Sequence, residues 1–125
     1  MEPVTRRLVR VLPRPPLAEL DFQRQLVGTK PPGLAVIYGW EHVHFRPAMT
    51  KHGYRTAGSG SMAMGWPDLV LARPRDCRVI AAELKRDGAK PSPDQERVLE
   101  VLSASGLEVY VWHPADWDAI EKVLR

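Results

Sequence analysis

The apolar residues of this 125-residue chain recur at two spacings, one typical of helices and one typical of strands. Spacings of three to four predict amphipathic helices at Leu17–Val27, from Ser92 to just before Gly106, and at Trp117–Leu124. Alternating or continuous apolar runs predict strands at Glu41–Arg46, Leu69–Arg73, Arg78–Leu84 and Leu107–Trp112. This order of elements predicts an α/β fold with a mixed central sheet flanked by helices.

Other segments give weaker patterns. Leu34 to Tyr38 fits either a short helix or a strand. Residues 47–64 are glycine-rich and basic and show no periodicity, so a long loop is expected there. The strand at Leu107–Trp112 is apolar at almost every position and is expected in the centre of the sheet. Four prolines among residues 1–16 predict a flexible N-terminal segment, which leaves residues 17–125 as a single domain.

Length and composition limit the class of protein. A chain of 125 residues forms a core without disulfides, and the single cysteine, Cys77, cannot form one within the chain. No apolar run approaches the ~20 residues that cross a bilayer, and the arginine- and proline-rich start does not fit a signal peptide. We therefore expect a soluble, intracellular and cytoplasmic protein without a membrane partner.

The charge is distributed unevenly along the chain. The overall net charge is +3, but residues 1–43, 44–86 and 87–125 carry about +2, +5 and −4, counted from their Lys, Arg, Asp and Glu residues. A positive central section favours binding of a polyanion there. The candidate phosphate contacts in this section are Arg46, Lys51, Arg55, Arg73, Arg75, Arg78 and Arg86.

Two of the predicted strands carry charged residues where a core would exclude them. Glu83 and Lys85 project from one face of their strand, because side chains alternate in a strand. If Arg73 pairs with Arg78 in an antiparallel hairpin, Asp68 lies opposite Glu83 on the same face, and a one-residue slip would separate them. Two carboxylates and an ammonium suit a hard divalent cation and an attacking water. The alternative interpretation is an exposed ion pair on an edge strand, with Asp68 as a turn residue.

An ordered set of motifs resembles one family, the VRR-NUC (virus-type replication and repair nuclease) branch of the PD-(D/E)XK nuclease superfamily. The matching motifs are Glu19-Leu20-Asp21-Phe22-Gln23, Gly39-Trp40, His44-Phe45-Arg46-Pro47, Gly65-Trp66-Pro67-Asp68-Leu69-Val70, Glu83-Leu84-Lys85, Ser92-Pro93-Asp94-Gln95 and Val109-Tyr110-Val111-Trp112. The resemblance implies a restriction-endonuclease-like PD-(D/E)XK core and a helix at Leu34–Tyr38. Gly28 to Gly33 departs from the family pattern as an insertion in the first helix.

The resemblance also implies the site residues. Asp68, Glu83 and the backbone carbonyl of Leu84 would bind Mg²⁺, or Mn²⁺ as a substitute, with Glu19 as a water-mediated or second-metal ligand. Lys85 would orient or deprotonate the attacking water. Gln95 would support the metal site, although a capping box with Ser92 accounts for it equally well.

The function implied is a metal-dependent DNA endonuclease that acts on branched, junction or flap DNA as a homodimer. A catalytically inactive DNA-binding or complex-assembly module on the same fold is the alternative. The residues expected to contact nucleic acid are His44, Arg46, Lys51, Tyr54, Arg55 and Arg86.

Overall fold

The structure of the protein is a computed structural model that describes residues 17–45, 48–50, 53–55 and 58–125, with side chains described for residues 19–45 and from residue 58 onward. The predicted flexible segment, residues 1–16, lies outside the described residues. Within these ranges no helix combines the length and the apolar character needed to cross a bilayer.

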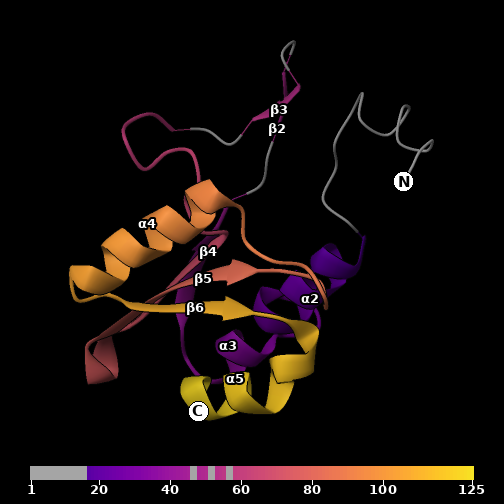
Figure 1. Ribbon diagram of the computed structural model, residues 1–125. Coiled ribbons are helices and arrows are strands. Elements are labelled where there is room, and N and C mark those ends of the chain that lie inside the picture. The colour runs from indigo at the N-terminus through magenta and orange to yellow at the C-terminus, as the bar shows by residue number, and fades with distance from the viewer. Residues whose placement is uncertain (1–16, 46–47, 51–52, 56–57) are drawn as a thin grey trace.

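A four-stranded mixed sheet forms the centre of the fold (Figure 1). Its order is β1 (Glu41–His44), β4 (Leu69–Arg73), β5 (Arg78–Leu84) and β6 (Glu108–Trp112). The pairs β1/β4 and β4/β5 are antiparallel, whereas β5/β6 is parallel. The predicted α/β fold with a mixed sheet is therefore confirmed.

The central position predicted for β6 is wrong. In the described part of the chain β6 pairs only with β5 and lies at the edge of the sheet, while β4 and β5 are central. Its apolar character has another cause. Helices lie on both faces of the sheet, so the side chains on both faces of β6 are wholly or partly shielded from solvent.

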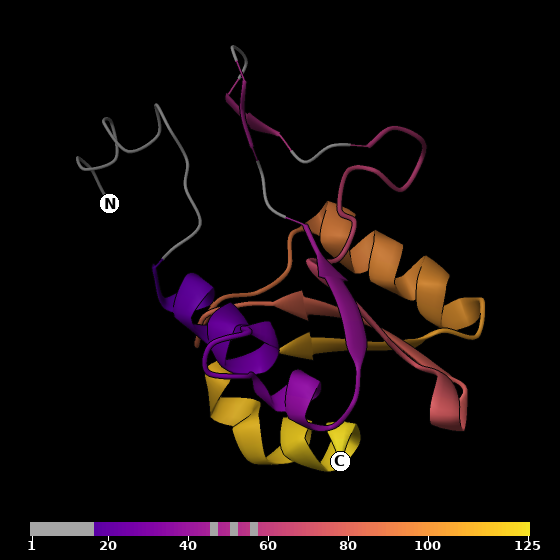
Figure 2. The same cartoon turned by 180° about the vertical axis from the view of Figure 1, so that it is seen from behind.

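Helices cover the two faces of the sheet unequally. α2 (Leu17–Val27), α3 (Leu34–Ile37) and α5 (Trp117–Leu124) lie on one face, and α4 (Pro93–Ala104) lies on the other (Figures 1 and 2). The main core forms on the three-helix face, where alternate residues of β4 and β5 meet apolar residues of the helices. Its fully buried members include Phe22, Leu26, Leu69, Leu71, Ile80, Ile120 and Leu124.

Two short turns and one short helix follow local rules. Leu34 to Ile37 is helical, as the resemblance implied. The β4–β5 connection is a 3₁₀ turn, Pro74–Asp76, followed by Cys77 in the left-handed region at φ 55°. A second 3₁₀ turn, Pro114–Asp116, leads into α5. Proline at the first position suits each 3₁₀ turn, because its fixed φ is close to helical.

The long loop predicted over residues 47–64 is wrong in its first half. Ala48–Thr50 (β2) and Gly53–Arg55 (β3) pair antiparallel as a small separate sheet. This hairpin stands away from the main sheet, beyond the start of α4 (Figure 1). Strands of three residues are too short to show a periodicity in sequence, which is why the pattern missed them.

Candidate active site

The register of the β4–β5 hairpin brings the two candidate carboxylates together. Arg73 pairs with Arg78 and Leu69 pairs with Ala82, so that the residue numbers of each pair sum to 151. Extending this register by one residue sets Asp68 opposite Glu83, on the face that α4 covers. The predicted register is confirmed.

Glu83 is the most enclosed acidic residue of the site. It lies in a central strand and its side chain is 1% exposed, which excludes the alternative of an exposed ion pair on an edge strand. Its Oε2 accepts a hydrogen bond from Gln95 Nε2 at 2.8 Å and lies 3.3 Å from Lys85 Nζ. Its Oε1 is buried and receives no hydrogen bond from any described residue. One oxygen of this carboxylate is therefore held in place, and the other lacks a donor.

Asp68 is fixed by the backbone on both sides. Its Oδ2 accepts a hydrogen bond from the Leu84 backbone N–H at 2.9 Å, and its carbonyl accepts one from Phe45 N–H at 2.8 Å. The Phe45 ring meets Trp66 edge to face, with centroids 6.4 Å apart, and Pro67 is fully buried. Asp68 is thus positioned as part of the sheet and does not act as a free turn residue.

The Leu84 backbone also bears on the predicted ligand set. In an extended strand the N–H and C=O of one residue point to the same side. Because the Leu84 N–H donates to Asp68, its carbonyl faces the same side of β5, whereas Lys85 N–H turns to β6 and bonds the Trp112 carbonyl at 2.9 Å. This orientation is compatible with the role expected for the Leu84 carbonyl.

Burial and mutual repulsion disfavour ionisation of both acids. Burial, reinforced by the nearby Asp68 carboxylate, raises the pKa of Glu83 to about 8. Burial also raises the pKa of Asp68, against the opposing effect of the Leu84 N–H. The two carboxyl groups are close enough to share a hydrogen bond when one of them is protonated. The site therefore needs either a proton or a cation between its acids.

Glu19 reaches this neighbourhood from α2. Its carboxylate accepts a hydrogen bond from the Arg86 backbone N–H and interacts with both Lys85 and Asp68, while partial burial raises its pKa. However, no group of three or more His, Cys, Asp or Glu side chains in the described residues is arranged to hold a metal ion. Glu19 borders the Asp68–Glu83 pair, and its role as a ligand stays a prediction.

The insertion at Gly28–Gly33 does not move Glu19 away from the site. The segment folds back on the end of α2, where Gly28 N–H bonds the Arg24 carbonyl and Gly33 N–H bonds the Gly28 carbonyl, each at 2.8 Å. Gly33 packs so closely on the backbone of Leu26 that an added Cβ would lie 2.5 Å from it. The extra residues are accommodated as a compact loop after α2.

Gly65 makes a close backbone contact beside the site, which the sequence motifs contained but did not explain. It adopts a φ of +101°, and a Cβ placed there would lie 2.4 Å from the Asp94 carbonyl oxygen. The segment leading into Asp68 therefore packs directly on the start of α4. Ser92 and Gln95 form the predicted capping box of that helix. A glycine three residues before the aspartate was the available signal for this contact.

The structure describes only some of the side chains expected to contact nucleic acid. His44 lies exposed at the end of β1 and stacks on His42, and Arg86 is exposed directly after the site strand. Arg46 and Lys51 lie outside the described residues, and so do the side chains of Tyr54 and Arg55.

Two of the candidate phosphate contacts are engaged within the fold, and the prediction is wrong for the buried Arg73. Arg73 is 3% exposed and is paired with Asp76. Arg78 is paired with Glu108, with Nη2 2.6 Å from Oε2. Both guanidinium groups also lie against the Trp40 ring, so they belong to the body of the fold.

Comparison with known proteins identifies one family. The family model of the VRR-NUC domain matches residues 45–116, more than half of the chain. This range contains Asp68, Glu83, Lys85 and Gln95 and excludes Glu19. Comparison with curated proteins finds no match.

Proposed function

This chain belongs to the VRR-NUC family of nucleases, and on that basis we propose that it is a metal-dependent endonuclease that hydrolyses phosphodiester bonds in DNA. The observation that carries the proposal is the buried Glu83 carboxylate, which faces a second carboxylate and has one oxygen without a donor. A buried anion of this kind is costly unless a cation or proton neutralises it.

The donor set fits a hard divalent cation. Carboxylate and carbonyl oxygens are the ligands that Mg²⁺ and Mn²⁺ prefer, and Asp68, Glu83 and the Leu84 carbonyl supply them from adjacent segments. Glu19 is the proposed water-mediated or second-metal ligand. When bound, the ion would neutralise charge on the phosphate and lower the pKa of a bound water.

Lys85 and Gln95 have distinct proposed roles beside the carboxylates. The Lys85 Nζ lies 3.3 Å from Glu83 Oε2. As an ammonium it orients the attacking water and stabilises negative charge on the phosphate, and as the neutral amine it accepts the proton of that water. A single acid or base contributes about 10²–10⁴-fold to a rate, so it cannot account alone for phosphodiester hydrolysis. Gln95 donates a hydrogen bond to Glu83 Oε2, while Oε1 has no hydrogen-bond partner among the described residues. It acts as a positioning residue.

The substrate and the oligomeric state can also be proposed. We propose that the enzyme selects branched DNA, such as flaps or four-way junctions, in replication, repair or recombination, and that it acts as a homodimer. A two-fold dimer presents two equivalent sites, which matches the symmetry of a junction. Exposed His44 and Arg86 flank the carboxylates and are the described candidates for contacts with DNA.

The test uses supercoiled, linear duplex, single-stranded, flap and four-way DNA with Mg²⁺, Mn²⁺ or EDTA. The proposal expects nicking of at least one substrate with metal and none with EDTA. An inactive binding module on the same fold would shift these substrates in a gel without cutting any of them. Sedimentation with and without DNA tests the homodimer separately.

A further inference from the structure

The loop between α2 and α3 forms an unusual surface feature. Thr29 and Pro32 make an isolated antiparallel bridge, which presents Pro31 and Pro32 to solvent. Together with the packing of Gly33 on Leu26, this bridge gives the loop a defined conformation. The loop residues are those expected from the sequence to form an insertion, and they lie outside the range that the family model matches.

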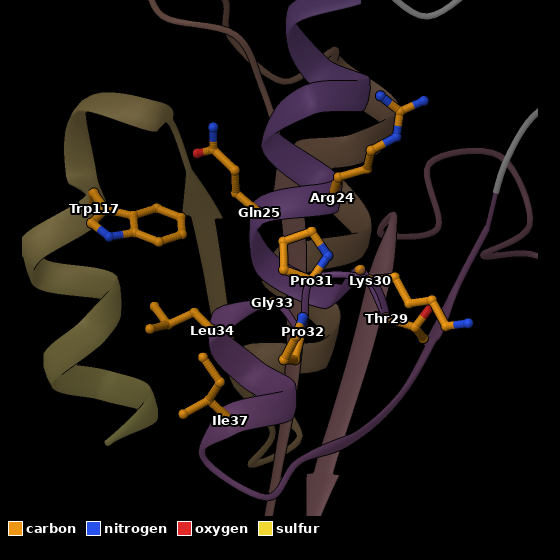
Figure 3. A pocket seen from close by; sticks show the side chains of 11 residues that line it. Arg24, Gln25, Thr29, Lys30, Pro31, Pro32, Gly33, Leu34, Ile37 and Trp117 are labelled. Carbon is orange, nitrogen blue, oxygen red and sulfur yellow. The ribbon is translucent and has the colours of Figure 1, made fainter.

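A hollow of about 760 Å³ opens beside this loop. One wall is apolar and includes Trp117, Leu34 and Ile37, and Ile37 is 63% exposed despite its apolar side chain. Figure 3 shows these three side chains on one side of the proline loop and Arg24 and Lys30 toward the other. Aromatic and apolar walls with a few polar groups are typical of binding pockets of this size.

A second hollow adjoins this pocket on the side nearer β1. It measures about 200 Å³, shares Arg24, Gly28 and Thr29 with the first, and extends to His42 and His44. His44 pairs with Leu69, the residue directly after Asp68. The two hollows therefore form one surface, here called the α2–α3 trough, that runs from β1 to Trp117 on the face of the sheet opposite the Asp68 and Glu83 side chains.

We infer that the α2–α3 trough binds a single-stranded arm of the DNA substrate, with an unpaired base against Trp117 and flanking phosphates at Arg24 and Lys30. This inference rests on the proposed function. The charges of Arg24 and Lys30 complement a polyanion, and the Trp117 side chain in the same pocket offers an aromatic ring to an unpaired base. Both observations favour DNA over an uncharged partner.

The chemistry of the pocket selects an unpaired nucleotide. Bases stack on aromatic side chains once they leave a duplex, and this stacking tolerates any sequence. The Gln25 side chain also lines the pocket and offers both a donor and an acceptor to the edge of a base. A hollow of about 760 Å³ is of small-ligand size, which suits one splayed nucleotide and excludes a duplex.

Arg24 can be released to a phosphate at little cost. Its Nη1 lies 3.3 Å from Asp21 Oδ1, and the two side chains are 68% and 59% exposed. Ion pairs this exposed contribute little to stability, so an incoming phosphate competes with Asp21 effectively. Lys30 is exposed and lies directly before Pro31.

The test measures binding of fluorescein-labelled oligo(dT), and of a duplex of equal length, by anisotropy in EDTA. We expect the single strand to bind more tightly than the duplex. Trp117→Ala should weaken single-strand binding about tenfold, which corresponds to about 1.4 kcal/mol, whereas Trp117→Phe should retain most of it. Lys30→Ala should weaken binding and reduce the salt dependence by about one phosphate contact. Lys122→Ala, an exposed lysine of α5 that lines neither hollow, is the matched control.

The outcomes separate this inference from the nuclease proposal. If Trp117→Ala and Lys30→Ala fold and bind oligo(dT) as the wild type does, the inference is wrong. It is also wrong if Ile37→Glu converts a dimer to a monomer without changing oligo(dT) binding, because the pocket then serves a second copy of the chain. If oligo(dT) binding depends on Trp117 but the protein cuts no DNA with Mg²⁺ or Mn²⁺, binding in the trough is supported and the nuclease proposal is wrong.

Discussion

Gln95 Nε2 donates a hydrogen bond to Glu83 Oε2 at 2.8 Å, while Gln95 Oε1 accepts one from the Ser92 backbone N–H, also at 2.8 Å. The same side chain therefore caps α4 and holds the most buried carboxylate of the site. Capping of α4 and a hydrogen bond to Glu83 therefore do not exclude each other in this structure. They share one amide group, with each function using a different atom.

Replacing Gln95 by glutamate should separate these two roles. The Gln95→Glu variant keeps an acceptor for the Ser92 N–H and places a negative charge at a helix N-terminus, so the capping of α4 should be retained. It also puts a third carboxylate beside Glu83 in place of a donor, so cleavage should fall strongly. Gln95→Ala should lose both activity and about 1 kcal/mol of stability. Urea unfolding and initial cleavage rates measure the two effects, and full activity in Gln95→Glu would contradict the positioning role.

Lys85→Ala should abolish cleavage while DNA binding stays largely intact. The Lys85 ammonium lies beside Glu83 and is 17% exposed, so it is placed for chemistry at one phosphate more than for general attraction of DNA. A loss of about 10²–10⁴-fold in the single-turnover rate is expected. Anisotropy in EDTA measures binding separately, and Lys90→Ala, a lysine further along the chain, is the control. Equal losses of binding and cleavage would count against a catalytic role.

Gly65→Ala should destabilise the fold by roughly 2–4 kcal/mol and reduce activity, because alanine there adopts an unfavourable φ and collides with the backbone of α4. Gly106 provides a matched control. It has nearly the same φ, +98° against +101°, but no atom lies within 4 Å of an added Cβ. Gly106→Ala should therefore cost only the conformational part, about 1–2 kcal/mol. Equal destabilisation of the two variants in urea would show that the contact with Asp94 is unimportant.

The parts of the site that could be predicted from sequence depend on short-range rules. The four-residue turn between Arg73 and Arg78 fixes the register of the hairpin, and that register alone sets Asp68 opposite Glu83. The Ser92–Gln95 capping box likewise needs only residues three apart. Such features follow from local geometry, so the sequence predicts them without knowledge of the rest of the fold.

The features that escaped prediction depend on distant partners. The apolar pattern of β6 indicates cover on both faces, but it does not distinguish a central strand from an edge strand that helices cover. The burial of Arg73 depends on acceptors 35 and 51 residues away in sequence, the Tyr38 and Leu124 carbonyls. No pattern around Arg73 indicates those contacts, which is why it resembled a surface arginine.

Arg73→Lys should destabilise the protein by roughly 2–4 kcal/mol without weakening DNA binding. The guanidinium of Arg73 donates to both Asp76 oxygens and to the Tyr38 and Leu124 carbonyls, at 2.8–3.0 Å. A lysine ammonium cannot reach all four acceptors, so part of this network is lost, although the Leu124 carbonyl keeps its hydrogen bond from Trp40 Nε1 at 2.9 Å. The exposed neighbour Arg75, substituted in the same way, should show little effect on stability. Weaker DNA binding by well-folded Arg73→Lys would restore it as a phosphate contact.

The metal-free protein should lose stability as the pH rises from about 4.5 to about 8. The pKa of Glu83 is 4.5 when unperturbed and about 8 in the fold, chiefly because of burial and then because of Asp68. Between these values the unfolded chain releases a proton that the folded chain retains, so the free energy of unfolding decreases with pH. The loss is on the order of a few kcal/mol, since a tenfold change in proton affinity corresponds to about 1.4 kcal/mol.

Urea unfolding in EDTA at about pH 5 and about pH 8 measures this loss, with Glu83→Gln as the control because its side chain does not titrate. The pKa values of Asp68 and Glu19 are also raised, so these two groups make stability fall with rising pH in the same direction as Glu83. The Lys85 ammonium and the Gln95 amide, which face Glu83, reduce the size of this loss. The difference between wild type and Glu83→Gln therefore isolates the carboxyl pair. Because a cation competes with the proton for the same oxygens, Mg²⁺ should stabilise the wild type more at the higher pH than at the lower. An equal effect of Mg²⁺ at both pH values would place the ion away from Glu83.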